Sequence, residues 1–267
     1  MSKYKVKPLS PEGLKTYSLF SRKSKVAIKD FARPFPAEES FRRWLRSLPE
    51  ILAGRDFKDF LSAMAEAKKK RKAILFALGA HVVKVGLSPV IIDLMKEGWI
   101  TGLALNGAGV IHDFEIAFAG KTSEDVGLQV KKGQFGMAQE TGEMVNEAIS
   151  SSEKEGLGLG QAVARMIASS DFPYKEASLL CAAYRLNIPL TVHVAVGTDT
   201  IHFHPKAKGE AWGKASLKDF FLFCALLEKL EGGGVFVNVG SAVILPEIFI
   251  KALSFIRNKG RRLEDFT

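Results

Sequence analysis

The residues best suited to chemistry follow short apolar runs in this sequence. Asn106-Gly107-Ala108-Gly109 comes directly after the apolar run Gly102–Leu105 and opens a helical pattern. Glycines let backbone N–H groups approach a phosphate closely, and a helix N-terminus adds a partial positive charge. Two glycines alone are a weak signal, and the other interpretation is a tight turn whose glycines serve packing only. Because the turn lies between a strand and a helix, we favour a dinucleotide or phosphate turn.

A titratable pair, His112 and Asp113, lies just beyond this turn. An imidazole has an ordinary pKa near 6.5, which suits proton transfer at neutral pH. Either side chain could reach a ligand crevice and act in catalysis. Asp113 could equally cap a helix start or pair with a nearby base, and the residues alone leave both interpretations open.

Polar residues also stand where other apolar runs end. Asp199 lies in the loop Gly197-Thr198-Asp199-Thr200 after a buried run, where a carboxylate can hold the ammonium group of a substrate. Asn238 and Ser241 belong to the stretch that ends the run Val235–Val239, and we expect them to line the same crevice. His193, His202 and His204 show no metal-binding motif, so no metal site is expected.

Two strand–turn–helix units must position these residues. The apolar runs Ala73–Leu78 and Gly102–Leu105 are each followed by a helical pattern. Such repeats build a parallel sheet, whose strand carboxyl ends meet at one edge and form the ligand crevice. Ile188–Val196 and Val235–Val239 are predicted as further strands. Gly120–Ser123 is predicted as a loop in which Thr122 or Ser123 caps the next helix.

Length and composition indicate an ordinary globular protein. The chain has 267 residues, a net charge of +9, and 47% hydrophobic residues. Its basic residues are spread out and no RNA-binding signature accompanies them, so nucleic acid is not expected as a partner. No apolar run reaches membrane-spanning length, and the first residues lack the apolar core of a signal peptide. Cys181 and Cys224 suggest neither zinc nor a disulfide, and the cytoplasm is the simplest location.

The chain is predicted to divide into two parts that form one compact unit. Residues 1–72 are expected to be a basic N-terminal arm followed by helices over Glu39–Leu52 and Asp56–Lys70. Residues 73–267 are expected to be the dinucleotide-binding domain. Within it, Glu210–Lys214 is interpreted as an exposed loop.

From about Ile74 onward, these segments resemble the deoxyhypusine synthase group. The shared features are a small-residue turn, a T/N-x-A/G-G turn followed by an acidic stretch, an N/H-I-P strand leading to an aspartate loop and F-F-H, and a G-G-G-V strand. In this chain the small-residue turn is Gly79-Ala80-His81, and the second turn with its acidic stretch is Asn106–Gly109 with His112-Asp113. The strand with its aspartate loop corresponds to Asn187-Ile188-Pro189, followed by Asp199 and Ile201–His204, and the G-G-G-V strand corresponds to Gly232–Val235. The resemblance implies an α/β fold: a Rossmann-like parallel sheet with helices on both faces that binds NAD.

The resemblance also implies where NAD would bind. The expected cofactor-binding residues are Gly79, Ala80, His81, Asn106, Gly107, Ala108, Gly109, Gly197, Gly232, Gly233 and Gly234. Asp199 and Ser241 are expected to bind the substrate. The resemblance further implies a homo-oligomer, a tetramer in that group.

Two departures from the family pattern concern its catalytic groups. In the family a catalytic histidine follows the G-G-G-V strand, and the same register places Asn238 at that position here. An asparagine cannot act as a general base near neutral pH. The family's imine-forming lysine lies in a W-G-K segment after that strand, whereas Trp212-Gly213-Lys214 comes before it. We therefore expect neither deoxyhypusine synthase activity nor an imine on Lys214.

The stretch N-G-A-G-x-x-H-D-x-E is also similar to NAD-dependent ornithine cyclodeaminase domains of the lysine-ketoglutarate-reductase type. That similarity implies that His112, Asp113 and Glu115 lie close to the cofactor and an amino-acid substrate. One hypothesis is an NAD-dependent enzyme that acts on a small amine or amino acid by transient oxidation. The other is a non-catalytic nucleotide-binding or assembly protein that kept the fold, since fold alone does not decide function.

Overall fold

The computed structural model of the chain describes residues 9–28, 41, 45, 52–152 and 154–267. The helix predicted over residues 39–52 lies largely outside these residues. The second predicted helix is present as α2 (Leu52–Lys69), which ends in the basic run before the first strand of the main sheet.

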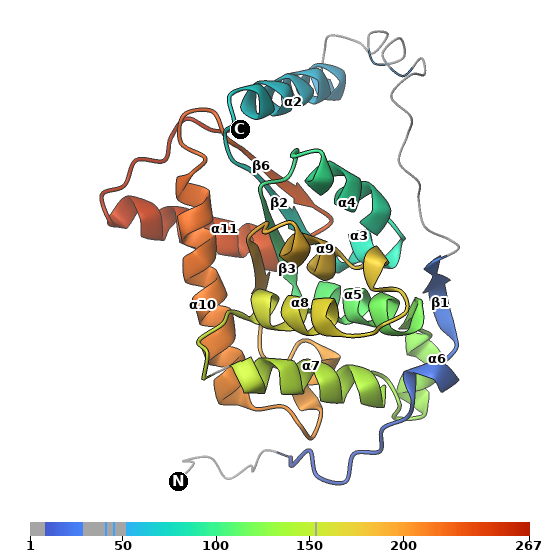
Figure 1. Ribbon diagram of the computed structural model, residues 1–267. Helices are drawn as coiled ribbons and strands as arrows, with labels where there is room; N and C mark the ends of the chain where they lie inside the picture. Colours follow the sequence, from blue (N-terminus) through green and yellow to red (C-terminus); the bar gives the residue numbers. More distant parts are fainter. Residues whose placement is uncertain (1–8, 29–40, 42–44, 46–51, 153) are drawn as a thin grey trace.

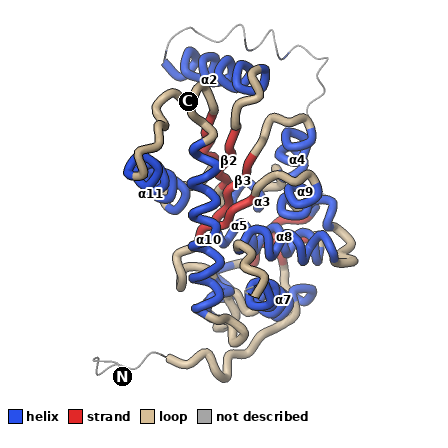
Figure 2. Tube along the Cα trace, turned by 60° about the vertical axis from the view of Figure 1, so that its left-hand side comes forward, coloured by secondary structure: helices blue, strands red, loops and turns tan. Residues whose placement is uncertain are grey.

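The centre of the molecule is a four-stranded parallel sheet with the strand order β5-β3-β2-β6. Its strands are β2 (Ile74–Leu78), β3 (Gly102–Asn106), β5 (Leu190–His193) and β6 (Val235–Val239). β2 pairs with β3 on one side and with β6 on the other, and β3 pairs with β5. Because all four strands run in the same direction, their carboxyl ends meet at one edge. Figure 2 shows β2 and β3 at the centre of the molecule, with helices around them.

Helices cover both faces of this sheet, which confirms the predicted fold class. Along the chain they are α3 (Ala80–Lys84), α4 (Ser88–Lys96), α5 (Gly107–Ala119), α6 (Val126–Lys131), α7 (Gln139–Ser152), α8 (Leu159–Ser169), α9 (Leu179–Arg185), α10 (Gly209–Glu228) and α11 (Ile244–Asn258), with short 3-10 turns at Leu19–Ser21, Lys175–Ala177 and Thr200–Phe203. α10 and α11 pack on one face, and α4, α5, α8 and α9 lie on the other (Figure 1). Among the described residues, no helix is long and apolar enough to cross a membrane.

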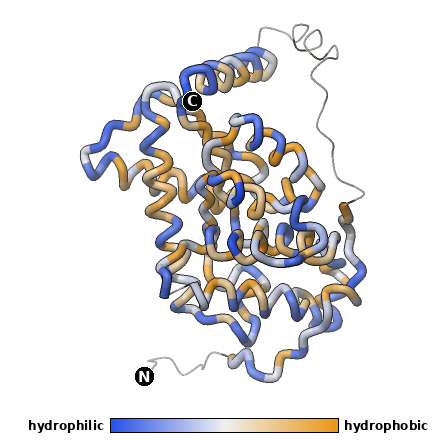
Figure 3. The backbone as a smooth tube through the Cα atoms, viewed as in Figure 1, coloured by the Kyte–Doolittle hydropathy of each residue, from blue (hydrophilic) through white to orange (hydrophobic). Residues whose placement is uncertain are grey.

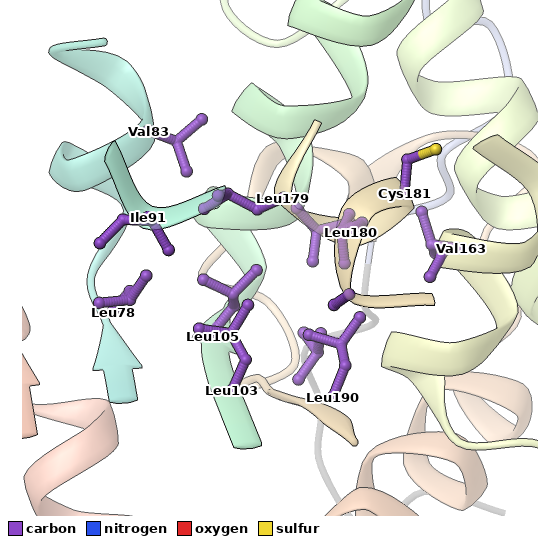
Figure 4. Close-up of a cluster of buried hydrophobic side chains, with 14 of the residues drawn as sticks. Leu78, Val83, Ile91, Leu103, Leu105, Val163, Leu179, Leu180, Cys181 and Leu190 are labelled. Atoms are coloured by element: carbon purple, nitrogen blue, oxygen red, sulfur yellow. The ribbon is translucent and has the colours of Figure 1, made fainter. Parts of the chain in front are cut away.

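The strand sequences explain this two-sided burial. In β2, Ile74, Phe76 and Leu78 join the larger core, and the alternate residues Leu75 and Ala77 face α10 and α11. A strand buried on both faces reads as one continuous apolar run, as β2 does. Figure 4 shows the larger core, in which Leu78, Leu103 and Leu190 lie among leucines and valines of the covering helices. Apolar segments accordingly concentrate at the centre of the chain trace (Figure 3).

Two predicted loops are regular structure instead. The segment around Gly120–Ser123 forms β4 (Lys121–Glu124), which pairs antiparallel with β1 (Ser24–Ala27) of the N-terminal arm. That partner lies about a hundred residues away, so local sequence gave no sign of it. The next helix, α6, is capped by Asp125 rather than by Thr122 or Ser123. Glu210–Lys214 lies within α10, where the Trp212 side chain is buried.

Candidate functional site

A cavity of about 250 Å³ lies along one face of α5. Ala108, Ile111, His112 and Glu115 line it, and their spacing places them on a single side of the helix. The other lining residues are Arg22 of the arm, Lys84 of α3, Ser123, Glu124, Val126, Phe135, Gly136 and Ala138 from β4 to the start of α7, Thr141 of α7, and Thr198, Asp199 and Thr200 after β5. The cavity thus joins the carboxyl edge of the sheet to the N-terminal arm.

A buried ionic group forms one wall of this cavity. The Arg22 guanidinium donates to Glu115 at 2.6 Å and lies 3.6 Å from Glu124, and all three side chains are at most 7% exposed. Burial alone would lower the pKa of Arg22, but Glu115 and Glu124 outweigh burial and raise it. Glu124 also accepts hydrogen bonds from the Tyr17 hydroxyl and from the Gly136 backbone N–H. Arg22 is therefore a fixed cation that neutralises these carboxylates.

His112 is neutral and has a defined tautomer. Thr122 Oγ1 lies 2.5 Å from Glu115 Oε2 and 2.7 Å from His112 Nδ1. Since the Glu115 oxygen that binds Arg22 can only accept, the Thr122 hydroxyl donates to it and accepts from His112 Nδ1–H. Burial, followed by Lys84 and Arg22, lowers the pKa of His112 to about 4. At neutral pH, Nε2 is thus the ring nitrogen that can accept a hydrogen bond.

Asp199 supplies a second acceptor in the cavity. Its side chain is 11% exposed, and Oδ2 is buried without a hydrogen-bond partner in the described part of the chain. Burial raises the pKa of this carboxyl to about 6. A Cβ placed on Gly107 would lie 2.1 Å from Asp199 Oδ2, so the carboxylate rests against the first residue of α5. The glycine turn and the aspartate loop predicted from the sequence therefore meet.

Other predicted residues gather at the same edge of the sheet but outside the cavity lining. Gly79 donates its backbone N–H to Val239, and a Cβ on Gly79 would lie 2.0 Å from the Gly240 carbonyl oxygen. Asn238 is exposed on β6 and donates to the Ser241 carbonyl, and the Ser241 hydroxyl accepts from Leu245 N–H. Ala80 and His81 begin α3 beside this group. Asn238 and Ser241 are thus not brought to His112 and Asp199.

Asp113 does not reach the cavity either. Its fully buried carboxylate accepts hydrogen bonds from the Ser178 hydroxyl and from the backbone N–H groups of Leu179 and Leu180. These are the first residues of α9, so Asp113 closes the N-terminus of that helix. Burial raises the pKa of Asp113 to about 6, against the effect of these hydrogen bonds. The helix-capping alternative fits this geometry, although the helix capped is α9 and not α5.

The expectation that Gly232, Gly233 and Gly234 line the same crevice is wrong in its placement. These glycines precede β6 and therefore lie at the amino edge of the parallel sheet. Gly233 N–H donates to Asp265, Gly234 N–H donates to Leu230, and a Cβ on Gly234 would meet Leu230 and Ala73. Crowding against neighbouring backbone explains the glycine at 234. Gly197 remains near the site, in the loop that carries Asp199.

The two glycine turns at the carboxyl edge are packed against other parts of the chain. The space beside Gly79 is filled by Gly240, and the space beside Gly107 is filled by the Asp199 carboxylate. At the start of α5, the Gly109 N–H group already donates a hydrogen bond to the Asn106 side chain. An anionic carboxylate beside this helix start also repels a phosphate. The residues at these turns therefore do not fit a bound pyrophosphate.

Several lining residues had no sequence signal. Arg22 belongs to the segment predicted as an arm, Glu124 directly follows the predicted loop Gly120–Ser123, and Lys84 lies in a short helix next to Gly79. Glu115 does have a sequence signal, because the similarity to ornithine cyclodeaminase domains names it, and residues 108, 111, 112 and 115 form a single helical face. Among the described residues, no group of three or more His, Cys, Asp or Glu side chains could hold a metal ion.

Comparison with known proteins places the fold near three solved structures. No protein-family model and no curated protein matches the sequence. ArgZ, an arginine dihydrolase of the cyanobacterial ornithine-ammonia cycle, is 16% identical with a TM-score of 0.47, over 76% of this chain and 26% of that chain. AgrE, solved with ornithine and NAD+, is 17% identical with a TM-score of 0.41, over 76% of this chain and 25% of that chain.

The third structure is a protein of Entamoeba histolytica assigned as a deoxyhypusine synthase. It is 11% identical with a TM-score of 0.42, over 84% of this chain and 96% of that chain. The chain is thus structurally similar to the deoxyhypusine synthase group at distant identity. The chain spans about a quarter of ArgZ and AgrE, so their activities belong to much longer chains. At these identities the likeness concerns the fold alone.

Proposed function

We propose that the cavity beside α5 binds a small cationic amine or amino acid, with Asp199 holding its ammonium group. The observation that carries the proposal is the buried Asp199 Oδ2, which lines the cavity and has no hydrogen-bond partner among the described residues. A buried polar atom without a partner is destabilising, and a donor from a ligand would satisfy it. Three N–H donors make an ammonium group well suited to this role.

The charges around the cavity support a cationic ligand. Its lining holds three carboxylates, those of Glu115, Glu124 and Asp199, against the cations Arg22 and Lys84. His112 adds no charge at neutral pH, because its pKa is lowered to about 4. Since Arg22 already pairs with Glu115 and Glu124, Asp199 is the carboxylate left to attract a cation.

The size of the cavity and its acceptors define the ligand further. A volume of about 250 Å³ lies just below the range of roughly 300–1,000 Å³ for pockets that enclose drug-sized ligands. A small amine or amino acid suits this volume better than a dinucleotide. His112 Nε2 offers a second acceptor for the ligand's N–H groups. The Asp199 carboxyl, with a pKa of about 6, can also move a proton near neutral pH. The lowered pKa of His112, about 4, makes its imidazole a weak base there, contrary to the expectation from its ordinary pKa.

The NAD-dependent oxidation stays a prediction from the resemblance. In its support, the β3–α5 turn lies at the carboxyl edge of a parallel sheet, where dinucleotide folds bind their cofactor. Against it stand the filled spaces at Gly79 and Gly107. Homo-oligomerisation is also kept as a prediction. We therefore test the amine and the dinucleotide separately.

Ligand binding is expected to raise thermal stability. Butane-1,4-diamine or ornithine at a hundredfold excess over its Kd should stabilise the fold by about 2.7 kcal/mol. Butane-1,4-diol, which has no charge, should have no effect. Thermal melts with amine alone, NAD alone and both together distinguish the hypotheses. Stabilisation by NAD and not by amines would support the nucleotide-binding alternative and contradict this proposal.

Loss of the Asp199 charge is expected to weaken amine binding. Asp199→Asn should reduce the affinity by about 1.5–3 kcal/mol, the scale of a hydrogen bond to a charged group. Titration calorimetry with butane-1,4-diamine measures this change. His112→Ala should also weaken binding, because it removes the second acceptor. If both variants lost thermal stability but kept the wild-type affinity, the two residues would have a structural role only.

Gly107→Ala is expected to disturb the same group. The new methyl group would meet Asp199 Oδ2 and displace the carboxylate from the cavity. Amine affinity should then fall about as far as in Asp199→Asn. Gly213→Ala is a matched control, since Gly213 is exposed within α10 and a Cβ there meets no atom within 4 Å. That variant should bind normally and gain about 0.5–1 kcal/mol of stability.

A further inference from the structure

We infer that His202 is a positioning residue for Asp199. It holds the loop of residues 197–199 through its Nδ1 atom and presents its Nε2–H to the Asp199 carboxylate. The inference rests on the proposed function, in which Asp199 is the group that binds the amine. His202 does not line the cavity, so its effect on a ligand would pass through Asp199.

Two hydrogen bonds fix the ring of His202 in this loop. The backbone N–H groups of Gly197 and Asp199 both donate to His202 Nδ1, at 3.0 and 3.2 Å. The side chain is only 2% exposed, and burial lowers its pKa, which keeps the ring neutral at neutral pH. Since Nδ1 accepts, the single ring proton must be on Nε2.

The protonated nitrogen of His202 lies near the Asp199 carboxylate. His202 Nε2 lies 4.0 Å from Asp199 Oδ2, and neither atom has a hydrogen-bond partner in the described part of the chain. At this distance the N–H dipole favours the ionised carboxylate without closing a hydrogen bond. Oδ2 therefore keeps its acceptor capacity for a ligand. The arrangement stabilises the charge that a cationic ligand requires.

A second layer of contacts holds the His202 ring. The ring packs edge-on against Trp212, with the ring centres 4.5 Å apart. Trp212 Nε1 donates to the Asn146 side chain at 2.7 Å, and Asn146 Nδ2 donates to the Ile201 carbonyl at 3.0 Å. Residues from α7 and α10 thus fix the turn that carries His202. Trp212 therefore supports the His202 ring, and this contact accounts for the buried tryptophan without any role for the W-G-K sequence.

Other charged groups also face Asp199 across the cavity. They are Arg22 and Lys84, which favour the carboxylate, and Glu115 and Glu124, which oppose it; His112 is uncharged. Burial raises the pKa of Asp199 to about 6 in the presence of all these groups. Amine binding should therefore increase as pH rises through about 6. Loss of the His202 donor should raise the Asp199 pKa and move this midpoint to higher pH.

Two substitutions separate the two roles of the ring. In His202→Asn, the side-chain oxygen can replace Nδ1 as acceptor, but the Nε2–H is lost. In His202→Leu, both are lost. The control is His204→Asn: His204 is buried nearby, but its Nδ1 accepts from Lys206 N–H and its ring lies against Gly142. Each variant is studied by hydrogen exchange of residues 195–200 without ligand, and by calorimetry with butane-1,4-diamine from pH 5 to 8.

The inference predicts a distinct result for each variant. His202→Leu should speed exchange of the Gly197 and Asp199 amides and weaken amine binding about tenfold, the equivalent of one hydrogen bond of roughly 1.4 kcal/mol. His202→Asn should keep slow exchange but move the binding midpoint to higher pH. His204→Asn should change neither.

Two results would overturn the inference. One is unchanged amide exchange in His202→Leu. The other is wild-type affinity and midpoint in both His202 variants while Asp199→Asn loses binding. If the wild type bound no amine, the proposed function would fail as well, and faster exchange in His202→Leu would then show a loop-holding role only.

Discussion

Replacing Arg22 by leucine is expected to lower the free energy of unfolding by about 3–5 kcal/mol. The Arg22 guanidinium is 3% exposed and neutralises Glu115, which is 2% exposed, across a contact of 2.6 Å. Removing the cation leaves that carboxylate buried without its charge partner. Within the described part of the chain, Glu115 would keep only the hydroxyl donors of Thr122 and Thr141. Chemical denaturation of the two proteins measures the difference.

Two further variants test the reason for this loss. Arg165→Leu removes an exposed arginine from its pair with Glu155, and it should cost less than about 1 kcal/mol. The double variant Arg22→Leu with Glu115→Leu also removes the carboxylate in closest contact with Arg22, while Glu124 keeps its hydrogen bonds from Tyr17 and Gly136, so stability should recover part of the loss. A double variant less stable than Arg22→Leu by the full cost of a second truncation would contradict the electrostatic explanation.

The strands and turns were predictable because their causes are local. β2 and β3 are continuous apolar runs that end at glycine or asparagine, and burial on both faces requires such runs. The meeting of the Asn106–Gly109 turn with Asp199 also follows from the sequence, because parallel neighbours place their carboxyl ends together. The position of Gly232–Gly234 before β6 is in turn enough to place these glycines at the opposite edge.

The rest of the site depends on contacts between distant segments. Arg22 meets Glu115 across 93 residues, and Tyr17 meets Glu124 across 107. No local sequence pattern indicates such pairs, since each partner on its own is an ordinary polar residue. Asp113 shows the same limit: the sequence places it on α5 near the turn, but only the packing of α9 shows which way it faces. The sequence therefore identified candidate functional residues more easily than it predicted which way their side chains point.

A second large loss is expected for Asp219→Leu, which should destabilise the fold by about 2–6 kcal/mol. Asp219 Oδ2 accepts from Val192 N–H of the edge strand β5 at 2.7 Å and from Gly160 N–H at the start of α8 at 2.8 Å. Each buried N–H group left unsatisfied costs roughly 1–3 kcal/mol. The carboxylate thus accepts a hydrogen bond from a backbone N–H group of the edge strand, as a neighbouring strand would. Denaturant unfolding at neutral pH measures the loss.

Asp219→Asn is the matched control, and its effect should depend on pH. The amide oxygen can still accept from both N–H groups, so the loss at neutral pH should be much smaller than for leucine. Burial raises the pKa of Asp219 to about 7, far above its ordinary value of 3.8. The folded wild type therefore binds this proton more tightly than the unfolded chain does, and its stability should fall as pH rises from about 4 to 7. Asparagine has no such proton, so the stability of Asp219→Asn relative to the wild type should increase between pH 5 and pH 8, by up to about 1.4 kcal/mol per pH unit below 7. A difference between the two proteins that stays constant over this range would show that Asp219 does not exchange its proton on unfolding.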